Sequence, residues 1–171
     1  MPDTGNRSKV IVMTFGVIIT FLARLSLVLL FFPFSALDKL LNFDLARQQA
    51  RTVVASDSLA KALILTGLAV EVFMSLGVLS GVADRLAAFV LAGYCAVTAV
   101  LWKPFWRQPD FKLRGKSQGR EMFWDFLRNF ALAGGFLMIT LGPNAASVTH
   151  FFSAPLASSQ PYAMTLESAL P

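Results

Sequence analysis

Charged residues are scarce in this sequence. Only 15% of its 171 residues are charged and 56% are hydrophobic, whereas a typical soluble domain is about 25% charged and about 45–50% apolar. A water-facing surface needs more charge than this, and a disordered chain needs far fewer apolar residues. The composition therefore predicts a membrane protein, and the length predicts a single domain.

Cysteine and histidine are almost absent. The one cysteine, Cys95, excludes an intrachain disulfide, a CxxC redox pair and an all-cysteine metal site. The one histidine, His150, excludes a bis-histidine haem or a histidine-rich metal site built from this chain alone. We therefore expect no cofactor held by such motifs within the chain, so that any chemistry here requires a partner protein, a diffusible cofactor or no metal at all.

The net charge of +5 does not indicate a nucleic-acid surface. The basic residues flank apolar segments and do not form a stripe on a soluble fold, so anionic lipid is the expected counter-charge. We expect the lipid bilayer as a partner, and no nucleic acid.

Four apolar segments are long enough to cross a bilayer, which takes about 20 residues of helix. They cover residues 10–34, 60–82, 86–102 and 122–141. Together they predict an all-α, integral membrane four-helix bundle over residues 10–142, between a tail at 1–9 and a Ser-, Ala- and Pro-rich tail at 143–171. The first segment is too long for a signal peptide, so we expect an uncleaved helix.

Lysine and arginine counts in the loops predict the orientation. The first loop with the start of the second span carries four of these residues and the third loop carries six, which makes ten on one face. The other face carries Arg7, Lys9 and Arg85. The first and third loops are therefore expected in the cytoplasm and both termini outside.

Two loops are expected to contact the headgroup layer. Apolar and charged residues alternate over residues 36–58, which predicts a short amphipathic interfacial segment after the first helix. The third loop combines aromatic rings with basic residues, which is typical of an interfacial anchor. The residues assigned to the interface are Lys39, Asp84, Arg85, Phe105 and Trp106.

Ionisable residues inside the spans are the main candidates for a site. Arg24 lies roughly 21 Å along the first span and Glu71 roughly 17 Å along the antiparallel second span, so the two backbones should lie at similar depth. We therefore predict an Arg24–Glu71 ion pair in a polar pocket that also includes Arg128 and Asn129. This pocket is either a ligand, proton or quinone site, or an ion pair that only fixes helix register. Arg128 also lies close enough to the end of its helix to extend toward the interface.

Small residues mark the faces on which the helices should pack, because they allow close approach of backbones. The third span has such a stripe at Ala88, Ala92, Cys95, Ala96 and Ala99.

The order of motifs resembles the DoxX-like family of small bacterial membrane proteins. The resemblance rests on RLSLVLLFFPFSALDKLLNF, on Glu71 with Gly77, Gly81 and Asp84-Arg85, and on FLRNFALAGGFLMITLG. It implies a four-helix fold in the bacterial inner membrane. Residues of its shared pattern are Arg24, Lys39, Glu71, Arg85 and the segment 129–135, whereas Ala36 stands where the family usually has glycine.

The resemblance also implies an association with redox systems, because relatives include the membrane component of a thiosulfate:quinone oxidoreductase. Three functions follow as hypotheses. The first is a non-catalytic membrane subunit that anchors a redox complex next to quinone and has a protein partner. The second is an oxidoreductase component with its own quinone site at Arg24 and Glu71. The third is a carrier of lipids or small hydrophobic molecules.

Overall fold

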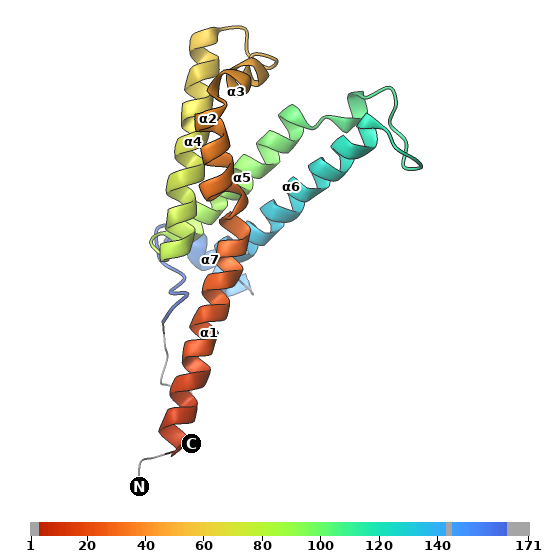
Figure 1. The fold of residues 1–171 in the computed structure, drawn as a ribbon. Coiled ribbons are helices and arrows are strands. Elements are labelled where there is room, and N and C mark those ends of the chain that lie inside the picture. Colours follow the sequence, from red (N-terminus) through yellow and green to blue (C-terminus); the bar gives the residue numbers. More distant parts are fainter. Residues whose placement is uncertain (1–3, 143–144, 164–171) are drawn as a thin grey trace.

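The described part of the chain, residues 4–142 and 145–163 of a computed structural model, is helical and contains no strand (Figure 1). The prediction of an all-α protein with four long helices and a short helical segment after the first is confirmed. The elements in chain order are α1 (Thr4–Val28), η1 (Leu30–Ser35), α2 (Ala36–Leu41), α3 (Phe43–Ala50), α4 (Asp57–Ser80), α5 (Asp84–Trp102), η2 (Phe105–Arg107), α6 (Gln118–Leu141) and α7 (Ala145–Ser153).

Three helical segments of the described chain are long and apolar enough to cross a membrane. They are Val12–Leu41, Asp57–Ser80 and Asp84–Arg107. The fourth predicted span corresponds to α6, which is as long as α4 but carries four charged residues in its first half. That α6 also crosses the membrane stays a prediction. Large apolar side chains point outward on all four long helices, as lipid contact requires: Phe15 is 62% exposed and Met138 66%.

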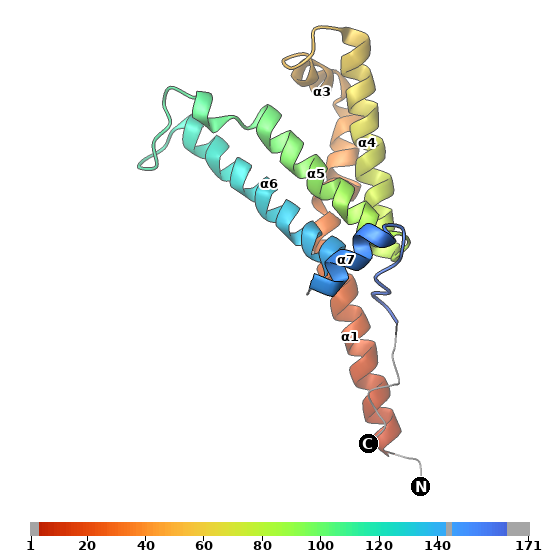
Figure 2. The ribbon, with the colours of Figure 1, turned by 180° about the vertical axis from the view of Figure 1, so that it is seen from behind.

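The first apolar segment continues past its predicted end at residue 34. Phe32 has an extended backbone (φ −127°, ψ 119°) before Pro33, because proline disfavours the helical conformation of the residue that precedes it. Beyond this kink the chain becomes helical again, and α2 and α3 pack along α4. The outer half of α1 projects beyond the other helices (Figures 1 and 2). The chain that packs along α4 therefore extends beyond residue 34, the predicted end of the first span.

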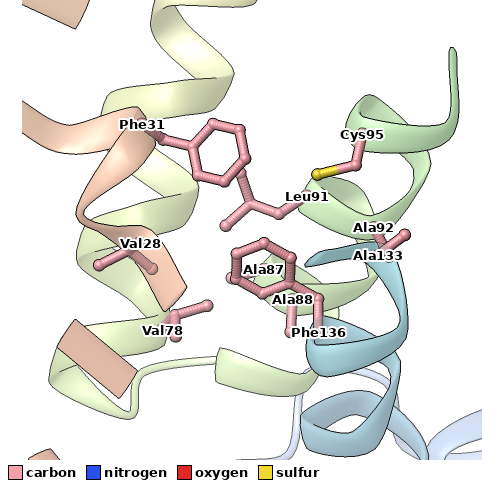
Figure 3. Packing of buried hydrophobic residues seen from close by; sticks show 10 residues of the cluster. All are labelled: Val28, Phe31, Val78, Ala87, Ala88, Leu91, Ala92, Cys95, Ala133 and Phe136. Atoms are coloured by element: carbon pink, nitrogen blue, oxygen red, sulfur yellow. The ribbon is translucent and has the colours of Figure 1, made fainter. Parts of the chain in front are cut away.

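The core lies where the first segment, α4, α5 and α6 meet (Figure 3). Phe136 of α6 and Leu91 of α5 are fully buried between Val28, Phe31 and Val78. These side chains come from α1, η1, α4, α5 and α6, so burying them fixes how the helices are arranged.

Small residues allow α4 and α5 to approach each other closely. A Cβ at Gly77 would lie 2.9 Å from the Cβ of Ala87, so a larger residue there would force the two helices to shift. The small-residue face predicted for the third span is buried at Ala88, Ala92, Cys95 and Ala99. Because these side chains are short, the helix backbones can pack tightly there.

From this core, the α5–α6 hairpin diverges from α4 (Figures 1 and 2). The α3–α4 connection and the α5–α6 connection lie at one end of the helix bundle, and the α4–α5 turn and α7 lie at its opposite end, beyond which α1 projects (Figure 1). Ten lysines and arginines were counted on the segments around these two connections, but one of them, Lys39, lies in α2 beside α4 and not in a loop. The fold places these two connections on one side, and which side of the membrane they face stays a prediction.

Candidate functional site: two buried ion pairs and a cavity

The predicted Arg24–Glu71 ion pair is wrong. Arg24 pairs with Asp84, at 2.7 Å between Nη1 and Oδ2, and Glu71 pairs with Lys39, at 2.6 Å between Oε1 and Nζ. The depth argument treated residues 10–34 as one straight span. The kink at Phe32 and the packing of α2 along α4 instead place Arg24 beside the end of α4 and Lys39 beside its middle.

The Arg24–Asp84 pair is enclosed by protein. The Asp84 side chain has no exposed surface and that of Arg24 is 9% exposed. Arg24 also donates to the carbonyl oxygen of Val78 at 2.8 Å. Asp84 opens α5, where the helix N-terminus favours a negative charge. Asp84, expected at the interface, is instead buried as the partner of Arg24.

A segment of the C-terminal tail covers this pair. We call residues 154–162 the strap. The Ser159 amide donates to Asp84 Oδ1 at 2.8 Å, its hydroxyl donates to Asp84 Oδ2, and that hydroxyl accepts from Arg24 Nη2 at 2.8 Å. Tyr162 donates to the carbonyl oxygen of Leu79 at 2.5 Å. The strap thus joins α1, the end of α4 and the start of α5.

The Lys39–Glu71 pair belongs to a second polar cluster, near the middle of α4. Three donors converge on Glu71 Oε1: Lys39 Nζ at 2.6 Å, Tyr94 Oη at 2.8 Å and Ser35 Oγ at 3.0 Å. Lys39 also donates to Ser35 Oγ at 2.6 Å. Glu71 is 1% exposed, yet its Oε2 atom has no hydrogen-bond partner among the described residues. Lys39, expected at the interface, therefore belongs to this buried cluster.

A cavity of about 430 Å³ adjoins the second cluster, between α2, α3 and α4 on one side and α5 and α6 on the other. Gly67 lets the Tyr94 side chain approach α4 closely at the cavity wall, since a Cβ there would lie 3.3 Å from Tyr94 Oη. The lining residues are Leu30, Phe31, Ser35, Lys39, Ala46, Gln49, Ala50, Leu63, Ile64, Gly67, Glu71, Tyr94, Thr98, Trp102, Lys103 and Asn129. A buried carboxylate, an ammonium and a phenol thus line a largely apolar cavity.

Of the two predicted site residues on α6, only Asn129 lies at the cavity. Asn129 lines the cavity and donates to the Asp125 carbonyl oxygen at 3.0 Å. The Arg128 side chain is 74% exposed and pairs with Asp125 at 2.8 Å. Arg128 is therefore not part of the pocket in which it was predicted, because it lies on the outer side of α6.

The other predicted interfacial residues lie at the two ends of the molecule. Arg85 is near His150 of α7, with 3.2 Å between Nη1 and Nδ1. Phe105 and Trp106 pack edge to face, 5.1 Å between ring centroids, and both also pack against Phe126. The aromatic loop is thus folded onto the start of α6.

Sequence reasoning missed Ser35, Tyr94 and Ser159. Ser35 lies one helical turn before Lys39, a spacing that does place two side chains together, but residues 36–58 were expected to be a surface loop. Tyr94 and Ser159 lie far along the chain from their partners, and local spacing carries no signal for them.

The described residues contain no group of three or more His, Cys, Asp or Glu side chains that could hold a metal ion. Cys95 is a free thiol in the apolar core.

Comparison with known proteins identifies the family. The DoxX family model matches residues 19–104, just over half of the chain. The chain belongs to the DoxX family. No curated protein and no solved structure matches. The DoxX match contains Arg24, Lys39, Glu71, Asp84 and Arg85, and so both buried ion pairs. The strap and α6 lie outside it.

Proposed function

We propose that this DoxX protein is the membrane subunit of a quinone-linked redox complex, and that it holds the quinone head in the cavity beside Glu71. The observation that supports this proposal is the combination of an apolar cavity with a buried cluster of hydrogen-bonding groups at one place in its wall. The cavity volume of about 430 Å³ lies within the range of about 300–1,000 Å³ that small-molecule sites occupy.

The residues present fit a quinone head, although not the residues first expected. Arg24 is enclosed with Asp84 and Ser159 and does not line the cavity, whereas Lys39 and Asn129 do. Their N–H groups suit oxygen atoms on a flat ring, and the apolar wall suits the ring and its tail. A bound quinone would supply two-electron chemistry, while the residues of this chain bind and orient it.

A direct binding measurement tests the proposal. Trp102 lines the cavity, so a short-tailed benzoquinone bound there should quench its fluorescence in the purified protein reconstituted in nanodiscs. Gly67→Leu should abolish the quenching that saturates, because a larger side chain there meets Tyr94 and occupies the cavity. Gly93→Leu is the matched control, since a Cβ at this exposed helical glycine would meet no described atom within 4 Å.

Equal quenching in both variants would contradict a quinone site in this cavity. Tight binding of phospholipid in place of the quinone, lost in Gly67→Leu alone, would instead favour a lipid or small-hydrophobe carrier.

The second part of the proposal is a protein partner in the bacterial inner membrane, with the basic loops in the cytoplasm. Purification from native membranes in mild detergent should yield a complex of fixed stoichiometry whose visible spectrum shows a flavin, haem or iron–sulfur partner. A protein that always migrates alone, without such absorbance, would contradict this part. Protease digestion of sealed vesicles tests the orientation: the loop over residues 107–117 should be cut only from the cytoplasmic side.

A further inference from the structure

The two oxygen atoms of Glu71 are used very unequally. Oε1 accepts three hydrogen bonds, and Oε2 accepts none from the described residues. An ionised carboxylate can accept about four hydrogen bonds, and leaving one of its buried oxygens without a donor costs free energy. Glu71 and its three donors all line the cavity, and the unused acceptor capacity is buried in this part of the cavity wall.

The neighbouring hydroxyl groups have no hydrogen to offer a ligand. The single hydroxyl hydrogens of Tyr94 and Ser35 are both donated to Oε1. Lys39 uses two of its three N–H groups, on Ser35 and on Glu71, and keeps one. At this point of the wall the protein therefore offers a ligand oxygen one donor, from Lys39, and one charged acceptor.

Resting on the proposed function, we infer that Glu71 makes the cavity selective for the reduced, hydroxyl-bearing form of its ligand, a hydroquinone. A ligand hydroxyl can accept from Lys39 and donate to Glu71, so it satisfies both groups. A quinone carbonyl can accept from Lys39 but has no hydrogen for the carboxylate, and its lone pairs face those of Oε2. The reduced form therefore makes one additional charge-assisted hydrogen bond.

The hydroquinone should bind about tenfold or more tightly than the quinone, because one additional hydrogen bond to a charged group raises a binding constant by at least this factor. For a two-electron couple, tenfold tighter binding of the reduced form raises the reduction potential of the bound ligand by about 30 mV. The inference concerns binding alone and requires no electron transfer by this chain.

The test compares two probes, each titrated alone, on the full-length protein in nanodiscs. The first is an alkylated hydroquinone kept anaerobic, and the second is its dimethyl ether, which has the same ring and tail but no hydroxyl hydrogen. Calorimetric titration of each probe, and separately of the parent quinone, gives the affinities without mixing the oxidised and reduced forms. We expect the hydroquinone to bind about tenfold more tightly than the ether and than the parent quinone.

Glu71→Gln sharpens the test. With its carbonyl oxygen accepting from Lys39, Tyr94 and Ser35, the amide group presents N–H in place of Oε2, so the preference should disappear or reverse toward the quinone. The comparison in the unmodified protein decides the inference even if this variant does not fold. Equal binding of all three probes, abolished by Gly67→Leu, would overturn the selectivity and leave the quinone site standing. Binding of no probe would overturn both.

Discussion

The two buried ion pairs are alike in length but differ in their surroundings. Arg24 and Asp84 are covered by the strap, and the Ser159 amide and hydroxyl complete their hydrogen bonding. Lys39 and Glu71 border a cavity, and one oxygen of Glu71 lacks a donor from the described residues. A pair whose groups are all satisfied and enclosed is suited to fixing helix positions, whereas a pair with spare capacity beside a cavity is suited to binding.

This contrast predicts the largest effect for Arg24→Leu. The substitution leaves Asp84 buried without its cation, which should cost about 3–5 kcal/mol of stability. Thermal unfolding in detergent measures the loss. Arg24→Leu combined with Asp84→Leu should be more stable than Arg24→Leu alone, because no charge is then left unpaired. Additive destabilisation in the double variant would contradict the pairing.

Lys39→Met should have a smaller effect on stability and a larger effect on binding. Tyr94 and Ser35 still donate to Glu71, and water can enter the adjoining cavity, so the expected cost is about 1.5–3 kcal/mol. Quinone affinity should fall in the same variant.

The matched control for this prediction is Lys61→Met. Lys61 makes a half-exposed contact with Asp57 at 3.2 Å, and its loss should change neither property measurably. A Lys39→Met variant as destabilised as Arg24→Leu would remove the distinction between the two pairs.

Ser159→Ala and Ser35→Ala compare the two ion pairs by removing one serine hydroxyl from each. Each serine donates to a buried carboxylate. Ser159→Ala should cost about 1–2 kcal/mol because the Asp84 side chain that it bonds has no exposed surface, and Ser35→Ala should cost less because water from the cavity can replace its hydroxyl. Unfolding midpoints of both variants, with the exposed Ser58→Ala on α4 as control, measure the difference. The reverse order would show that the strap does not enclose the first pair.

The smallest effect is expected at Asp125, which pairs with Lys103 and Arg128 at the surface of α6. Its side chain is 36% exposed, so Asp125→Asn should cost less than about 1 kcal/mol. The effect should shrink further in high salt, because the charges there are screened. Unfolding curves at low and high ionic strength check both statements.

The helical fold could be read from the sequence because hydropathy and helix length are local properties. The four apolar runs correspond to α1, α4, α5 and α6. The small residues of the third run correctly marked the buried face of α5. Glu71 and Arg24 were recognisable as buried groups because a charge inside an apolar run must be paired. Their partners were not recognisable, because depth along a straight helix ignored the kink at Phe32.

The sequence by itself determined that this chain is a helical membrane protein of the DoxX family with paired charges among its helices. Only the tertiary structure decided which charges pair, that the strap covers one pair, and that a cavity adjoins the other. The reason is physical: hydrophobic burial acts on each segment separately, whereas an ion pair a few ångströms long depends on the relative placement of helices that are distant in the chain.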